Sequence, residues 1–199
     1  MMAPVDVPTD KLREFADFDA FYTWLSDHHD SADEIWIRIF KKASGKPTIT
    51  PVEAIDAVLC WGWIDAIKKS WDAESFVQRY CPRRTKSVWS QINRNNVARL
   101  VEQGLMTEHG LRHVEAAKAD GRWDAAYKTN QDPPADLLAA IAADPAAQKT
   151  YDGLSSQNRF ALTFRTISLK TEAGRKKRIA DYVAMLARGE TIYPQKAKS

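Results

Sequence analysis

The fold is decided by the stretch Trp63–Tyr80, which reads WIDAIKKSWDAESFVQRY. Two runs rich in β-branched and aromatic residues, 63–71 and 75–80, are separated by a short polar turn, a pattern that predicts a β-hairpin. An earlier run, 34–41, places an isoleucine at every second residue, which is the period of a strand packed on one face. We therefore expect the hairpin to pair with this run in a small three-stranded antiparallel sheet.

Helical patterns surround these strands. Thr50, Pro51 and Glu53 form a capping box with proline at the first helical position, so a helix should begin here and run to about Trp61. Further helices are expected at about 19–28, from Ser87 as N-cap through Val101 with Trp89 on the helix, and from Thr107 to about Ala119. After Pro134 only helical spacing is found.

These patterns predict two domains of different class. The fold class expected is α+β, with helices on the small sheet in a domain at 15–130. An all-α C-terminal helical module should follow at 133–190. The polar, proline-containing segment 129–134 is the expected linker because it interrupts the apolar period.

The composition is that of a water-soluble globular chain. Its 199 residues are 44% hydrophobic and 28% charged, and no apolar run approaches the roughly 20 residues of a membrane helix. The first residues contain no secretory apolar core, so we expect a cytoplasmic protein with no membrane association. In a reducing compartment Cys60 and Cys81 should remain free thiols rather than form a disulfide.

Charge is distributed unevenly along the chain. Residues 75–101 contain six arginines and lysines and no aspartate or glutamate, although the net charge of the whole chain is only +3. Like charges repel one another unless an anion neutralises them. This stretch therefore predicts a surface that receives an anionic small molecule.

Several short blocks resemble the YdeI/OmpD-associated (bacteriocin-protection, OmdA) family. In the first part of the chain they are Trp61-Gly62-Trp63-Ile64-Asp65, Gln78-Arg79-Tyr80, Pro82-Arg83-Arg84, Ser87-Val88-Trp89-Ser90, Gly104-Leu105-Met106 and Gly121-Arg122-Trp123. In the second part they include Lys170-Thr171-Glu172 and Lys177-Arg178-Ile179. The resemblance implies a small bacterial cytoplasmic protein of unsettled activity, associated by name with tolerance of bacteriocins or antimicrobial peptides.

The candidate site is built from the hairpin and its exit. Asp65 begins one strand, and it could orient the guanidinium of Arg79 on the partner strand toward a ligand. The expected ligand-binding residues are Arg79, Arg83, Arg84, Ser87, Trp89 and Asn93, with the last two four residues apart on one helix face. Asp65 is the candidate catalytic acid or base.

A purely structural interpretation stays open for the same residues. Asp65 and Arg79 could form an ion pair that braces the hairpin, while Trp61, Trp63 and Trp89 fill the core and Arg83 and Arg84 face solvent. A second basic cluster, 175–178, could likewise be offset by Glu172 and Asp181 on its own helix.

Three functions are compatible with these residues. The favoured one is binding of an anionic small molecule, a carboxylate or phosphate. The alternatives are an enzyme in which Asp65 transfers protons while arginines hold an anionic substrate, and a weak nucleic-acid binder, which the low net charge disfavours. No metal site is expected, because His109 and His113 have helical spacing but no evident third ligand, and no cofactor motif is recognised. The sequence does not indicate the oligomeric state.

Overall fold

The computed structural model describes residues 6–128 and 131–195 of the chain. The chain divides into two compact units, Met1–Tyr127 and Lys128–Ser199. Residues 129–130 of the expected linker lie outside the described residues. In the described ranges, no helix combines the length and apolar character that a membrane span requires.

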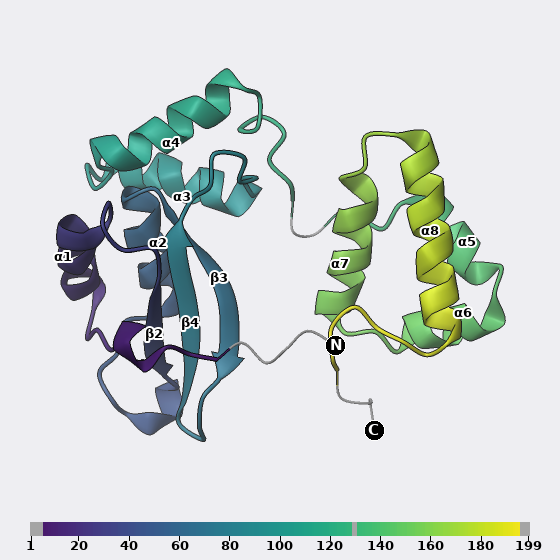
Figure 1. The fold of residues 1–199 in the computed structure, drawn as a ribbon, viewed down its shortest axis with the longest axis horizontal. Coiled ribbons are helices and arrows are strands. Elements are labelled where there is room, and N and C mark those ends of the chain that lie inside the picture. Colours follow the sequence, from purple (N-terminus) through teal and green to yellow (C-terminus); the bar gives the residue numbers. More distant parts are fainter. Residues whose placement is uncertain (1–5, 129–130, 196–199) are drawn as a thin grey trace. The chain divides into compact units, whose positions relative to one another are not determined.

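The N-terminal unit is an α+β domain around a four-stranded sheet (Figure 1). Its strands are β1 (Leu12–Arg13), β2 (Ile35–Phe40), β3 (Trp63–Ser70) and β4 (Ser75–Pro82). Its α-helices are α1 (Phe18–His28), α2 (Pro51–Cys60), α3 (Gln91–Glu102) and α4 (Glu108–Ala119), with short 3-10 turns at Thr9–Lys11 and Lys42–Ser44. The strand order is β1-β2-β4-β3.

The expected three-stranded antiparallel sheet was incomplete. Strands β2, β4 and β3 do pair antiparallel as predicted, but β1 adds a fourth strand that runs parallel to β2. This strand has only two residues, Leu12 and Arg13, paired with Trp36 and Ile37. Two residues carry no measurable alternation, so β1 exists only through its pairing with β2 and leaves no periodic signal in the sequence.

One face of the sheet is covered by α1 and α2, as Figure 1 shows. The core between them contains the alternating isoleucines Ile35, Ile37 and Ile39, together with Trp63 and Tyr80, all at most 1% exposed. Trp63 is therefore a core residue.

The capping box at the start of α2 is present in full: Glu53 N–H donates to Thr50 Oγ1, and Thr50 N–H donates to a Glu53 carboxylate oxygen.

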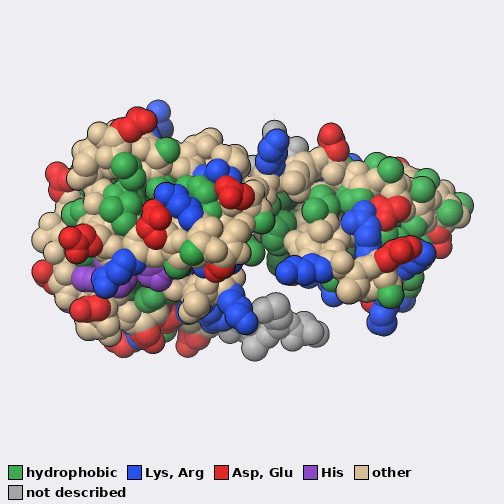
Figure 2. Space-filling model, turned by 90° about the horizontal axis from the view of Figure 1, so that it is seen from above, with side chains coloured by type: hydrophobic (Ala, Val, Ile, Leu, Met, Phe, Trp, Pro, Cys, Tyr) green, Lys and Arg blue, Asp and Glu red, His purple; other side chains and the backbone are tan. Residues whose placement is uncertain are grey.

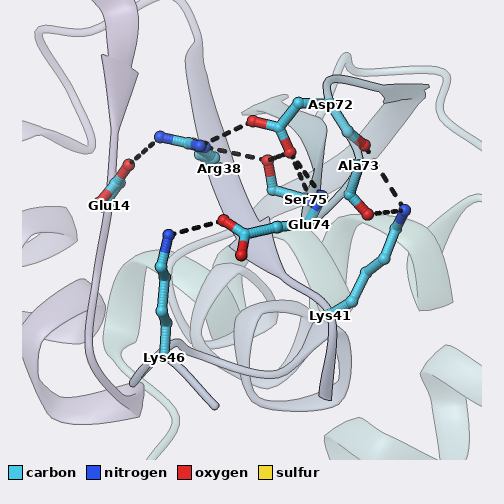
Figure 3. Close-up of polar contacts among 8 residues, drawn as sticks. All are labelled: Glu14, Arg38, Lys41, Lys46, Asp72, Ala73, Glu74 and Ser75. Atoms are coloured by element: carbon cyan, nitrogen blue, oxygen red, sulfur yellow. Dashed lines mark hydrogen bonds and ion pairs between the residues drawn. The ribbon is translucent and has the colours of Figure 1, made fainter. Parts of the chain in front are cut away.

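The β3–β4 turn is held by its own acidic residue (Figure 3). Asp72 Oδ1 accepts hydrogen bonds from the backbone N–H and the hydroxyl of Ser75, both at 2.7 Å, and Asp72 Oδ2 accepts one from Arg38 at 2.7 Å. These donors, with the Ser75 hydroxyl foremost, lower the pKa of Asp72 to about 2. The turn predicted from polarity alone is thus closed by side-chain bonds that also tie it to β2.

A second layer of the N-terminal unit joins the end of α2 to α3 and α4. Its core contains Leu59, Cys60, Trp89, Val97, Leu100, Val114 and Ala117. Helix α4 begins at its predicted cap, with Thr107 Oγ1 accepting from Gly110 N–H. Both cysteines, Cys60 and Cys81, are free thiols.

The start of α3 was predicted three residues too early. The N-cap is Ser90, whose hydroxyl accepts from Asn93 N–H at 3.1 Å, and Ser87 lies in the preceding loop. Trp89 consequently precedes the helix, and Trp89 and Asn93 do not share a helix face. Both serines were acceptable caps by type, and Ser90 is favoured because its neighbour Trp89 is buried in the second core.

The C-terminal unit is all-α over its described residues. It consists of α5 (Ala135–Ala142), α6 (Pro145–Asp152), α7 (Ser156–Ile167) and α8 (Glu172–Ala187). Leu137, Ile141, Leu162 and Leu186 are central to its core. The basic cluster at the start of α8 is offset within this unit: Arg175 pairs with Asp136, Lys176 with Glu172 and Lys177 with Asp181.

Candidate functional site

The loop between β4 and α3 positions the candidate site. Arg83 N–H donates to the carbonyl of Gly62 at 3.0 Å, which ties the end of β4 to the turn after α2. Within the loop, Arg84 N–H donates to Ser87 Oγ at 3.0 Å, and Ser87 N–H donates to the Arg84 carbonyl at 2.9 Å. Ser87 therefore shapes the loop instead of capping the helix.

Arg83 is a buried cation. Its side chain lies over the indole of Trp89, with Cζ 3.7 Å from the ring centroid, and the residue is only 5% exposed. Nη1 donates to the Val88 carbonyl at 3.3 Å, whereas Nε and Nη2 have no hydrogen-bond partner among the described residues. Burial lowers the pKa of Arg83 to about 10, so the guanidinium remains charged at neutral pH.

A first cavity of about 190 Å³ opens beside this guanidinium. It is lined by Arg83, Arg84, Thr85, Ser87, Trp89, Arg112, His113, Ala116 and Arg122. Arg122 is partly engaged, because its Nε donates to Asp120 and its Nη1 to the Ser87 carbonyl. All ionisable residues of this lining are basic.

His113 lies in the electrostatic field of these arginines. Burial, followed by the positive charges of its neighbours, lowers the pKa of His113. His113 also belongs to a group of three histidine rings: the centroid of His109 lies 5.4 Å from that of His113 and 4.6 Å from that of His29. Figure 2 shows histidine side chains gathered in one place on the N-terminal unit, against a Lys or Arg side chain. No group of metal-ligating residues is found in the described ranges.

A second cavity, of about 340 Å³, has different chemistry. It is lined by Ile64, Asp65, Arg83, Ser87, Val88, Ser90, Asn93 and Tyr127. Burial raises the pKa of Asp65, while the charge of Arg83 opposes this shift. Burial and the charge of Asp65 raise the pKa of Tyr127. Arg83 and Ser87 line both cavities.

Arg79 lies apart from the other expected site residues. It forms an ion pair with Glu34 and lines neither cavity. Asp65 is opposite Tyr80 in the β3–β4 register, and successive residues of a strand point to opposite faces. The Arg79 side chain therefore faces away from Asp65, so Asp65 does not orient it toward a ligand, and the alternative Asp65–Arg79 ion pair does not form either.

The remaining expected residues gather around the two cavities. Arg84, Ser87 and Trp89 line the first, and Asp65 and Asn93 line the second. The sequence did not assign Arg112, Arg122 or Tyr127 to the site, and it offered His113 only as a possible metal ligand. Arg122 lies in Gly121-Arg122-Trp123, one of the blocks noted for their resemblance, so a signal for it was present. Tyr127 reaches the site through a backbone bridge to Ser90, which no local pattern reveals.

Comparison with protein families assigns the two parts of the chain differently. Residues 13–113 match the family model described as a domain of unknown function, DUF8412. Residues 131–189 match the model described as bacteriocin-protection, YdeI or OmpD-associated, which confirms the resemblance for this part of the chain. No curated protein and no solved structure matches the chain.

The first match extends over half of the sequence, so the chain belongs to the DUF8412 family and carries a YdeI/OmpD-associated domain after it. Most residues of both cavities lie within the matched range 13–113, and Ala116, Arg122 and Tyr127 follow it.

Proposed function

We propose that the N-terminal unit binds a small anionic molecule, a carboxylate or a phosphate, at Arg83. The observation that carries this proposal is the pair of buried guanidinium nitrogens, Nε and Nη2, that have no partner among the described residues. A buried charged donor without a partner costs free energy that a bound oxyanion would recover. An oxyanion in the first cavity would supply the missing acceptors.

The surroundings of Arg83 favour an anion over a neutral ligand. Arg84, Arg112 and Arg122 line the same cavity, and no acidic side chain of the described residues lines it. Asp65 influences Arg83 electrostatically from the second cavity, but no hydrogen bond or ion pair joins the two among the described residues. A planar guanidinium also binds carboxylate and phosphate through two parallel hydrogen bonds. The site is therefore suited to oxyanions.

Arg83→Met tests this proposal by calorimetric titration with sulfate, phosphate and acetate. Methionine keeps an unbranched side chain over Trp89 and removes the charge and donors, so we expect oxyanion affinity to fall by at least about tenfold. Lys86→Met is the matched control, since Lys86 is exposed in the same loop and lines neither cavity. Its affinity should stay within about twofold of the unmodified protein.

Arg112→Gln covers the possibility that Arg83→Met does not fold. Arg112 is exposed, so its substitution should leave the fold intact and still weaken oxyanion binding severalfold. The proposal is wrong if the unmodified protein binds none of the three oxyanions, or if a folded Arg83→Met protein binds them as tightly as the unmodified protein.

A further inference from the structure

The two cavities at Arg83 differ in the sign of their ionisable groups. The first is lined by arginines and His113, whereas the second contains a single carboxylate, Asp65. Because Arg83 and Ser87 line both, a ligand held by Arg83 is close to both environments. A ligand that occupies both cavities must therefore have one group that binds to arginines and another that binds to a carboxylate.

The carboxylate of Asp65 is bonded by backbone alone. Asp65 is partly buried, and its carboxylate is hydrogen-bonded by its own backbone and by no side chain of the described residues. Asn93 lines the same cavity, and its side-chain amide has no hydrogen-bond partner among the described residues. Its backbone N–H donates to Ser90 Oγ. A carboxylate and an amide oxygen in one cavity are acceptors suited to a group with several N–H donors.

A simple anion would leave this part of the site unfavourable. An oxyanion at Arg83 is repelled by Asp65 whenever that carboxyl is ionised, and in a partly buried site such repulsion is weakly screened. A ligand that also carries a positive group near Asp65 converts this repulsion into attraction. The charges on the site residues thus discriminate between anions and molecules that carry both signs.

We propose that the ligand is a small zwitterion whose anionic group binds at Arg83 and whose ammonium group binds at Asp65. This inference rests on the proposed function, because it assumes that an oxyanion occupies Arg83. An ammonium group has three donors, for which Asp65 and the Asn93 amide oxygen provide acceptors. The anionic group is either a phosphate or a carboxylate.

Two pairs of probes test the inference by calorimetric titration. O-Phosphoethanolamine is compared with ethyl phosphate, and β-alanine with propionate, so that each pair differs chiefly in the ammonium group. We expect the unmodified protein to bind the zwitterion of at least one pair about tenfold more tightly than its partner, as for a charge-assisted hydrogen bond. The pair with the larger preference identifies the anionic group as phosphate or carboxylate.

Asp65→Asn should remove this preference. The variant should bind both members of the pair with similar affinity, whereas Arg83→Met should weaken both members. Glu102→Gln is the matched control, because it removes the same charge from an exposed position outside both cavities and should keep the preference.

The outcomes separate the two proposals. If ethyl phosphate or propionate binds and neither zwitterion binds more tightly than its partner, the zwitterion inference is overturned while anion binding stands. If none of the four probes and no oxyanion binds, the proposed function fails as well. Should Asp65→Asn not fold, the probe pairs on the unmodified protein still decide between these outcomes.

Discussion

His113 couples the first cavity to pH. Its pKa is lowered by burial and then by the positive charges around it, which come from His109, Arg83, Arg112 and Arg122. A bound anion offsets these charges, so the pKa of His113 should be higher in the complex than in the free protein. Binding then takes up a proton, and affinity must rise as pH falls through the range in which His113 titrates.

Sulfate is the suitable probe for this effect because, unlike phosphate, it does not titrate near neutral pH. We expect the dissociation constant for sulfate to decrease several-fold as the pH falls below about 6.5, the ordinary histidine pKa, because the pKa of His113 in the free protein lies below that value. His113→Gln should bind sulfate with a flatter pH dependence. An unchanged slope in this variant would show that His113 is not the group responsible.

At the residue scale, the charge pattern of the sequence pointed to the loop between β4 and α3 but not to the residues from other elements that surround it. Arg83, Arg84, Ser87 and Trp89 are close in sequence, so a local charge anomaly was enough to bring them together. Arg79 belonged to the same anomaly and yet points away, because strand alternation and pairing with Glu34 decide its direction. His113 and Tyr127 enter the site only through tertiary contacts.

At the element scale, the close approach of α4 to the end of α2 depends on Gly110. A Cβ atom at this position would lie 2.2 Å from the carbonyl oxygen of Cys60, which already accepts a 2.6 Å hydrogen bond from Thr107 Oγ1. The obstacle is backbone, so it cannot rotate away. The packing of these two helices therefore requires glycine.

Gly110→Ala should lower the free energy of unfolding of the N-terminal unit by about 1–3 kcal/mol or more, because the helices must separate. Gly153→Ala, in the C-terminal unit, is the control for glycine replacement as such: its added Cβ would meet only ordinary contacts, the nearest at 3.5 Å, and its φ is not positive, so the stability of that unit should change little. Chemical denaturation of both variants measures the difference. Equal stability of the Gly110→Ala and unmodified proteins would contradict the tight packing.

The elements themselves were predictable to different degrees. The capping box of α2 and the Thr107 cap of α4 are local signals, and both helices begin where those signals indicate. Strand β1 and the start of α3 depend on pairing with β2 and on burial of Trp89, respectively. Long-range packing decided both, and a periodicity argument cannot detect it.

At the scale of the whole molecule, each unit has a core of its own. Leu186 is fully buried in the core of the C-terminal unit, whereas Leu138 in the same unit is 38% exposed. All residues that line the two cavities at Arg83 belong to the N-terminal unit. Stability of the C-terminal unit and anion binding should therefore be separable properties.

Leu186→Ala should destabilise the C-terminal unit by about 2–5 kcal/mol through the cavity it creates, and Leu138→Ala should have a much smaller effect. Both variants should bind sulfate with unchanged affinity. Denaturation curves and sulfate titrations of the two proteins measure these effects. Loss of sulfate affinity in Leu186→Ala alone would show that binding requires the C-terminal unit.

The stacking of Arg83 on Trp89 also provides an optical signal at the site. An indole in contact with a guanidinium, with the ring of Trp123 only 4.9 Å away, has an emission that depends on its immediate electrostatic surroundings. An occupant that draws the cation toward itself changes the field on that fluorophore. The fluorescence of Trp89 should therefore report whether the first cavity is occupied, with no added dye.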